Sequence, residues 1–248
     1  MQDSIVFLHG FTGNQDDWAN IRERFNNQYH THAVDIIGHG QQASSQDLAN
    51  YDMAQVAQKI KARSPQKFHL VGYSMGGRLA LYTALRYPEI IKSLTLISVS
   101  PGLKTEAERE TRRQADNILA DKIEANGIEW FADYWGNLSL WDSQSPELKA
   151  HLRQKRLQNN PLGLANSLRR MGTGAMPSLW DKLPDLAMPV QLIVGELDTK
   201  FMAINQEMAE LIPDVRLTII ENTGHAVHLE KPDEVNITLD QFLNPHKT

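Results

Sequence analysis

The chain has 248 residues, no cysteine and a formal net charge of −5 at pH 7. The missing cysteines exclude disulfides and thiolate metal sites, which is typical of a reducing cytoplasm, and the negative charge argues against nucleic acid as a partner. No stretch approaches ~18 consecutive apolar residues and the first residues enter a strand directly, so we expect neither a membrane span nor a signal peptide. We therefore expect a cytoplasmic protein without a metal ion or another cofactor.

The first apolar run, residues 5–8, predicts a strand that leads into the turn His9-Gly10-Phe11-Thr12-Gly13. A histidine in such a turn commonly braces the loop. We therefore assign His9 no chemical role.

A second apolar run, residues 68–71, is followed by Gly72-Tyr73-Ser74-Met75-Gly76 and by a helix-forming stretch over 77–87. These five residues spell the G-x-S-x-G nucleophile elbow, in which a serine stands on a tight turn between a strand and a helix. The small flanking glycines allow the sharp bend, and the helix start offers free N–H groups to negative charge beside Ser74. Such a motif also arises by chance as a glycine-rich surface turn, so further evidence is needed.

Two later segments supply that evidence. A buried run over 189–194 ends in Gly195-Glu196-Leu197-Asp198, and a run over 215–220 is followed by Glu221-Asn222-Thr223-Gly224-His225. Taken alone, Asp198 is also consistent with a helix cap and His225 with a surface loop residue. Together they place an acid and a histidine after two strand ends, in the order serine, acid, histidine that α/β-hydrolase triads follow.

The turn over 9–13 is similar to the loop that completes the oxyanion hole in the α/β-hydrolase family. The resemblance implies that the backbone N–H groups of Phe11 and Met75 converge on one oxygen.

The order of the predicted elements indicates an α/β class protein with the α/β-hydrolase fold. Strands alternate with helices over 5–98 and again from 190 onward, which predicts a mainly parallel sheet of about six strands with helices on both faces. We assign 1–100 and 187–248 to this core and 101–186 to an inserted helical lid, with helices over 106–123 and 146–157. Only residues 1–4 precede the first strand, so the N-terminal hairpin of most α/β-hydrolases is short or absent here, and a partner could cover the missing edge.

The insertion holds four of the five tryptophans, Trp130, Trp135, Trp141 and Trp180. A helical lid over the strand ends would shape a pocket. The alternative is that these tryptophans only hold a small helical subdomain together.

Arginines narrow the chemistry. Arg78 follows Ser74 by one helical turn, so both residues can share one side of the helix start. Arg112, Arg113 and Arg156 lie in the lid, where arginines are commonly solvated and paired with acids. An ordinary esterase has little use for a cation at position 78.

The chain resembles the Gram-positive form of 2-succinyl-6-hydroxy-2,4-cyclohexadiene-1-carboxylate synthase, the menaquinone-pathway lyase family called MenH. The matching words span nearly the whole chain. They are L-H-G-F-T-G at 8–13, G-Y-S-M-G-G-R at 72–78, S-P-G-L at 100–103, E-T-R-R-Q-A-D at 110–116, W-F-A-D-Y-W at 130–135, N-N-P-L-G-L-A at 159–165, G-E-L-D-T-K-F at 195–201 and G-H-A-V-H-L-E at 224–230.

The resemblance implies elimination of pyruvate from 2-succinyl-5-enolpyruvyl-6-hydroxy-3-cyclohexene-1-carboxylate. Ser74, with Asp198 and His225, would act as the base that removes a ring proton. The three carboxylates of this substrate need a positive pocket, for which the resemblance implies Arg78, Arg112 and Arg156, with Arg113 as a substitute for Arg112. Tyr73 and either Tyr134 or Trp135 resemble aromatic pocket positions of the family.

Two other functions use the same fold, which by itself settles none. The first is a carboxylesterase or carbon–carbon bond hydrolase in which Ser74 is a true nucleophile. The second is a non-catalytic ligand receptor that keeps the triad. The expected partner is a small polycarboxylate, without nucleic acid or membrane, and the chain is expected to be a monomer or a homodimer.

Overall fold

A computed structural model describes residues 2–42, 45–63 and 66–244 of the chain. Its six strands form one sheet in the order β2-β1-β3-β4-β5-β6, and every neighbouring pair is parallel. The strands are β1 (Ser4–Leu8), β2 (His30–Val34), β3 (Phe68–Tyr73), β4 (Ile91–Ile97), β5 (Val190–Gly195) and β6 (Val215–Ile220). The predicted parallel sheet of about six strands is confirmed.

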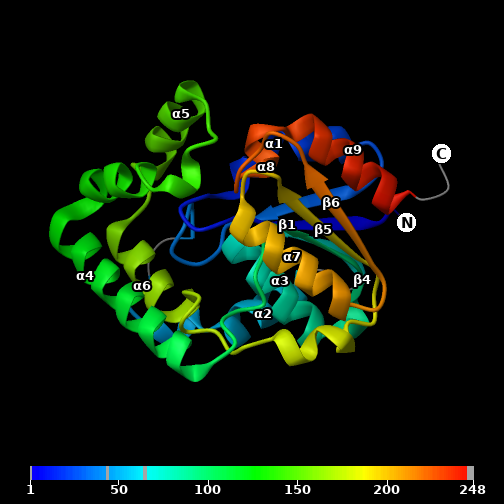
Figure 1. The fold of residues 1–248 in the computed structure, drawn as a ribbon, viewed down its shortest axis with the longest axis horizontal. Coiled ribbons are helices and arrows are strands. Elements are labelled where there is room, and N and C mark those ends of the chain that lie inside the picture. The colour runs from blue at the N-terminus through cyan, green and yellow to red at the C-terminus, as the bar shows by residue number, and fades with distance from the viewer. Residues whose placement is uncertain (1, 43–44, 64–65, 245–248) are drawn as a thin grey trace.

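Helices cover both faces of the sheet (Figure 1). One face carries α2 (Met53–Lys61), α3 (Ser74–Arg86) and α7 (Thr199–Leu211), and the other carries α1 (Ala19–Phe25), α8 (Val227–Glu230) and α9 (Pro232–Leu243). The side chains of β1 show how the layers form. Val6 and Leu8 belong to the core cluster under α2 and α3, whereas Ile5 and Phe7 belong to the cluster under α1 and α9. This alternation follows from the two-residue period of a strand.

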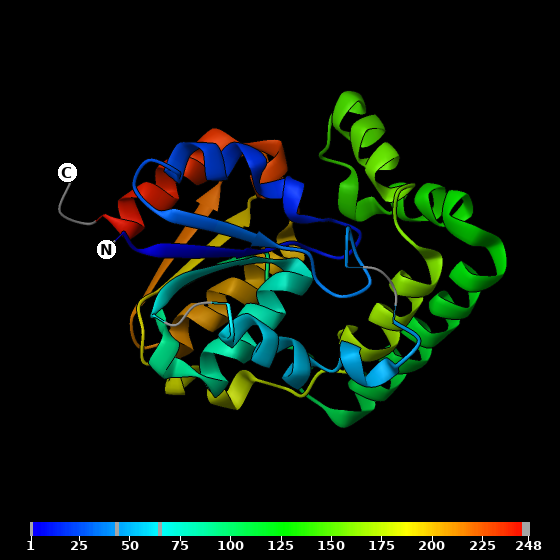
Figure 2. The same cartoon turned by 180° about the vertical axis from the view of Figure 1, so that it is seen from behind.

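Three long helices are inserted between β4 and β5. They are α4 (Glu106–Gly136), α5 (Pro146–Arg156) and α6 (Pro161–Met171). Figures 1 and 2 show them as the green arm beside the carboxyl ends of the strands. The first of these helices continues beyond the predicted end at residue 123, and it bends at Gly127, where φ is 82°. A bend there lets the rest of α4 turn toward the site, because glycine adopts this φ without the steric cost of a Cβ.

The last part of the predicted lid packs differently from the rest. Met176, Leu179, Trp180 and Leu183 belong to the core cluster on the α2 and α3 side of the sheet, and the indole of Trp180 donates to Gly102 O at 2.9 Å. The inserted helices that lie beside the carboxyl ends of the strands therefore make up only part of the segment 101–186, which was predicted as the lid. Trp180 holds the end of the insertion against the core.

Short 3-10 helices complete the fold. They are η1 (Gln15–Trp18), η2 (Leu48–Tyr51), η3 (Pro88–Ile90), η4 (Ser139–Trp141) and η5 (Trp180–Asp185). Two of them, η1 and η4, border the space between the sheet and the inserted helices. Within the described ranges, no helix combines the length and the apolarity needed to cross a membrane.

The strand register brings the loops of interest to one edge of the sheet. Leu8 pairs with Gly72, Tyr73 with Ile97, and Gly195 with Ile220. The turns that follow β1, β3, β5 and β6 therefore meet at the carboxyl ends of the strands, which is where open parallel sheets bind their ligands.

The inserted helices are fastened to this edge. Asn159, just after α5, donates to Thr12 O at 3.0 Å, and Lys155 of α5 forms an ion pair with Asp17 of η1. Arg170 of α6 pairs with Asp52 at the start of α2. These contacts hold the inserted helices against the segments that follow β1 and β2.

Candidate active site

Ser74 stands on a strained turn between β3 and α3. Its φ is +48°, which places a residue with a side chain in the left-handed region. A Cβ on Gly72 would lie 2.6 Å from Gly76 O, so the strand and the helix can approach this closely only because glycine stands there. The sequence pattern and the strained backbone thus agree that residues 72–76 form a nucleophile elbow.

Ser74, His225 and Asp198 form a chain of hydrogen bonds. His225 Nε2 lies 3.0 Å from Ser74 Oγ, and His225 Nδ1 lies 2.6 Å from Asp198 Oδ2. Since the carboxylate can only accept, Nδ1–H donates to it and Nε2 is left to accept the proton of the serine hydroxyl. The structure therefore brings the three predicted residues together in the geometry of a serine activated by an oriented histidine.

Asp198 has two structural tasks at once. Its Oδ1 accepts from Phe201 N at 3.4 Å and so caps α7, while its Oδ2 holds His225. The helix-cap interpretation and the triad interpretation are therefore both compatible with the structure. Only 7% of Asp198 is exposed, so little water competes for its bond to the histidine.

Glu230 holds the loop that carries His225, a role that the sequence analysis did not identify. One of its carboxylate oxygens accepts from Gly224 N at 3.0 Å and the other accepts from Ala226 N at 3.2 Å. The two N–H groups flank His225 on either side. The sequence feature that could have identified it is an acidic residue five positions after the histidine, which the structure places at the end of the short helix α8.

The predicted oxyanion-hole residues line the cavity that contains Ser74. Phe11 and Met75 both border it, and Met75 lies in the first turn of α3, where N–H groups have no acceptor within the helix. His9 is fully buried beside them. It accepts from Ile36 N at 3.0 Å through Nε2, and its Nδ1 lies 2.8 Å from Gly10 O. These contacts fix the loop that presents Phe11.

The cavity at Ser74 measures about 190 Å³ and lies between the sheet edge and the inserted helices. Apolar side chains and cations line it together with Ser74 and His225. The lining residues from the inserted segment are Arg112, Trp135, Leu140, Leu168, Met171, Gly172 and Thr173. Among the residues that the structure describes, no cluster of histidine and acidic side chains has the geometry to hold a metal ion.

Arg78 enters this cavity from α3. One terminal nitrogen donates to Met171 O at 2.9 Å, while the buried Nε has no hydrogen-bond partner among the described residues. Burial, followed by the positive charge of Arg112, lowers the pKa of Arg78 to about 10 despite the opposing effect of Asp116. A buried cation with an unused donor is costly for the empty protein, and an anion in the cavity would offset that cost.

Arg112 lines the cavity, and Arg113 does not. Arg112 Nε bonds Asp116 Oδ1 at 2.7 Å at the border of the cavity. Arg113 forms ion pairs with Glu106 and Glu110 on the outer side of α4. Of the two adjacent arginines, the structure therefore places Arg112 at the predicted position.

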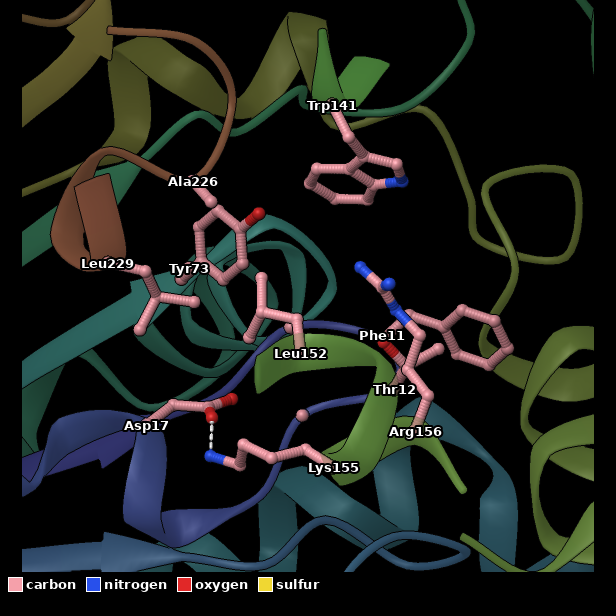
Figure 3. Close-up of a pocket in the computed structure, with 12 residues that line it drawn as sticks. Phe11, Thr12, Asp17, Tyr73, Trp141, Leu152, Lys155, Arg156, Ala226 and Leu229 are labelled. Atoms are coloured by element: carbon pink, nitrogen blue, oxygen red, sulfur yellow. Dashed lines mark hydrogen bonds and ion pairs between the residues drawn. The ribbon is translucent and has the colours of Figure 1, made fainter. Parts of the chain in front are cut away.

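Arg156 lies in a second, smaller cavity of about 30 Å³ that shares Phe11 with the first. Figure 3 shows its guanidinium below the Trp141 ring, while Tyr73 and the ion pair of Lys155 with Asp17 lie on the other side of Leu152 in this view. Only 4% of Arg156 is exposed, its Nε has no hydrogen-bond partner among the described residues, and burial lowers its pKa. Its guanidinium stands 5.6 Å from the centre of the Trp141 ring.

Of the three aromatic residues predicted to line the pocket, two line a cavity and one is exposed. Tyr73 lines the cavity of Arg156, and Trp135 lines the cavity of Ser74. Tyr134, in contrast, is 42% exposed and stacks on Trp130, with ring centres 5.2 Å apart. The structure corrects the assignment of Tyr134, because successive residues of a helix point about 100° apart and only Trp135 faces inward.

Comparison with known proteins agrees with this fold and geometry. The α/β hydrolase fold family matches residues 3–232. The chain belongs to the α/β-hydrolase fold family. It is 40% identical, over 97% of its length and 90% of the relative, to a Bacillus subtilis (strain 168) protein provisionally named 2-succinyl-6-hydroxy-2,4-cyclohexadiene-1-carboxylate synthase.

Two further relatives point the same way. A Salmonella arizonae protein named 2-succinyl-6-hydroxy-2,4-cyclohexadiene-1-carboxylate synthase is 32% identical over 96% of this chain and 93% of its own. A solved structure of MenH from S. aureus superposes with a TM-score of 0.92 at 36% identity, covering 99% of this chain and 95% of that one. The chain is thus a hydrolase-fold enzyme homologous to synthases of this name, and the resemblance to MenH is confirmed.

Removing the charge of Arg78 should stabilise the empty protein. Below pH ~10 the group is charged in the folded and unfolded states alike, so the full cost of burying it is present at neutral pH; the cost fades as pH rises through the lowered pKa. Arg78→Met should raise the free energy of unfolding at pH 7 by about 1 kcal/mol, after loss of the bond to Met171 O. Urea denaturation measures this difference.

The matched control for that measurement is Arg86→Met, at the exposed end of the same helix. Its effect should stay within about 0.5 kcal/mol. A clear loss of stability in Arg78→Met alone would show that Arg78 supports the fold instead of straining it.

Proposed function

We propose that this protein eliminates pyruvate from 2-succinyl-5-enolpyruvyl-6-hydroxy-3-cyclohexene-1-carboxylate and releases 2-succinyl-6-hydroxy-2,4-cyclohexadiene-1-carboxylate, a step of menaquinone biosynthesis. The observation that carries the proposal is the combination of a hydrogen-bonded Ser74–His225–Asp198 chain with the guanidinium groups of Arg78 and Arg156, whose buried Nε atoms have no hydrogen-bond partner among the described residues. The names of the homologues give the product of this reaction, and the family resemblance implies its substrate.

The names of substrate and product define the bonds that change. The substrate has its ring double bond between carbons 3 and 4, and the product has double bonds from carbon 2 and from carbon 4. A proton therefore leaves carbon 2, its bonding electrons form the new double bond to carbon 3, and the former double bond moves to carbons 4 and 5. The bond from carbon 5 to the enolpyruvyl oxygen breaks with its electrons going to that oxygen, and the released enolate becomes pyruvate when its methylene carbon takes up a proton.

Ser74 is well placed to take that proton. Its hydroxyl proton passes to Nε2 of His225, whose Nδ1–H remains bound to Asp198, and the resulting alkoxide removes the proton from carbon 2. Carbon 2 is next to the ketone of the succinyl arm, so negative charge develops on that ketone oxygen. The N–H groups of Phe11 and Met75 are the donors that would stabilise it.

The cations of the two cavities supply positive charge for a substrate with three carboxylates. Arg78 and Arg112 border the cavity of Ser74, and Arg156 borders the adjoining one. Their planar guanidinium groups bind carboxylates through two parallel hydrogen bonds, and these bonds strengthen where the inserted helices exclude water. Tyr73 and Trp135 would pack against the apolar faces of the substrate.

The direct test is pyruvate release from the enolpyruvyl substrate, followed by coupled detection. The wild-type protein should release pyruvate, and Ser74→Ala should lose at least about 10³-fold in kcat because the base is missing. A thermal unfolding midpoint equal to that of the wild type would show that the variant is folded.

The same assays distinguish the alternative functions. Efficient turnover of a short acyl ester with an accumulating acyl-enzyme, and no pyruvate, would support the esterase or carbon–carbon bond hydrolase alternative. A burst without turnover would support the receptor alternative.

Two arginines of α5 provide a matched pair for the carboxylate claim. Arg156 is buried in the small cavity, whereas Arg153 bonds Asp133 on the outer surface. Arg156→Met should raise KM for pyruvate release about 10–100-fold, the range of a lost charge-assisted hydrogen bond, and Arg153→Met should leave KM unchanged. Equal KM values in both variants would remove Arg156 from the binding site.

A further inference from the structure

Three cations that line the two cavities have no ion pair with an acidic group among the described residues: Arg78, Arg156 and Lys200. The other two lining cations are already paired, Arg112 with Asp116 and Lys155 with Asp17. A carboxylate that approaches Arg112 or Lys155 meets a charge that an aspartate partly cancels. The cavity-lining cations without an ion pair therefore include Lys200, to which the sequence analysis assigned no role.

Lys200 stands where two spaces join. It lines the cavity of Ser74, and it also lines a groove of about 520 Å³ formed by the residues around η4, the start of α7 and the loop of His225. Leu140 and His225 are shared by both spaces as well. Asp142 lines the groove, but no ion pair joins it to Lys200.

The size of the cavity at Ser74 makes this junction relevant. Its volume of about 190 Å³ falls below the roughly 300–1,000 Å³ typical of small-molecule sites. A ring with a succinyl arm, an enolpyruvyl arm and a ring carboxylate therefore needs neighbouring space. The small cavity of Arg156 shares Phe11 with the cavity of Ser74, and the groove shares Leu140, Lys200 and His225 with it.

We propose that Lys200 is a substrate-binding residue, which receives one terminal carboxylate of the polycarboxylate substrate where the cavity of Ser74 opens into the groove. The inference rests on the proposed function for the identity of the ligand. With Arg78 and Arg156, Lys200 gives each of the three carboxylates a cation that forms no ion pair with an aspartate or glutamate among the described residues.

A structural role for Lys200 is the alternative to exclude. Its ammonium group lies 5.8 Å from the ring centre of Phe201, and that ring lies 4.5 Å from the ring centre of His225. A lysine that only positioned His225 through Phe201 would affect kcat. A lysine that binds substrate would affect KM and the response of KM to salt, because rim charges are screened by ions.

The experiment compares Lys200→Met, Lys200→Arg and Lys122→Met in pyruvate release at low and high salt. Lys122 is an exposed lysine on α4 that lines none of the three spaces described above, so it serves as the matched control. Lys200→Met should raise KM about tenfold at low salt with little change in kcat, and salt should raise its KM less than that of the wild type. Lys200→Arg should restore most of the affinity. An unchanged KM in Lys200→Met, or a loss confined to kcat, would overturn the proposal.

Equilibrium binding separates this inference from the proposed function. Calorimetric titration of Ser74→Ala with the enolpyruvyl substrate requires no turnover, and adding Lys200→Met should weaken binding about tenfold. If the wild type binds the substrate without releasing pyruvate, the proposed function falls, and the role of Lys200 is still decided by this titration. Equal affinities with and without Lys200→Met overturn the inference alone, and no binding to Ser74→Ala overturns both.

Discussion

The hydrogen bond between His225 Nε2 and Ser74 Oγ joins groups that lie 151 residues apart in the chain. It can form only because parallel strands place the turns after β3, β5 and β6 at one edge of the sheet. The strained backbone of Ser74 lifts the hydroxyl toward the histidine, Asp198 fixes the histidine from behind, and Glu230 fixes the loop on either side of it. Packing at this edge of the sheet does not require the strained backbone of Ser74 or an oriented histidine beside it, so these features indicate a chemical function.

Charge decides how this serine is used. The fold and a triad are shared by many hydrolases, so neither distinguishes attack on a carbonyl from removal of a proton. The feature that bears on this choice is positive charge at Arg78 and Arg156, neither of which forms an ion pair with an acidic side chain in the described part of the chain. Keeping such groups charged and unpaired is unfavourable for the empty protein, which is why we propose an anionic ligand. The inserted helices border the space that we propose for this ligand.

Much of the fold was predictable because its strands are buried on both faces and read as apolar runs, as residues 5–8, 68–71 and 189–194 do. β2 gives no such signal. Its sequence is His30-Thr31-His32-Ala33-Val34, and as an edge strand it is partly exposed and needs few apolar side chains. The bend of α4 at Gly127 was also hidden, since a glycine within a helical pattern does not show whether the helix ends or continues in a new direction.

The site divides in the same way. Ser74, Asp198 and His225 were predictable because their positions after strand ends fix where they meet. The choice of Arg112 over Arg113, and of Trp135 over Tyr134, depends on how α4 is rotated about its axis, which only its packing against α6 and the core determines. Glu230 was missed because an acid on a short helix is a common feature, and only its hydrogen bonds to the histidine loop show what it does. An exposed lysine is equally common, so the role that we propose for Lys200 rests on its place in the lining of the cavity.

The proposed elimination requires that Ser74 and His225 remove a proton from the substrate ring. The most direct measurement is the single-turnover rate of pyruvate release from substrate that carries deuterium at ring carbon 2. If this proton is removed by the site, release from the deuterated substrate should be severalfold slower than from the ordinary one. Equal rates for the two substrates would contradict proton removal as the step that this site catalyses.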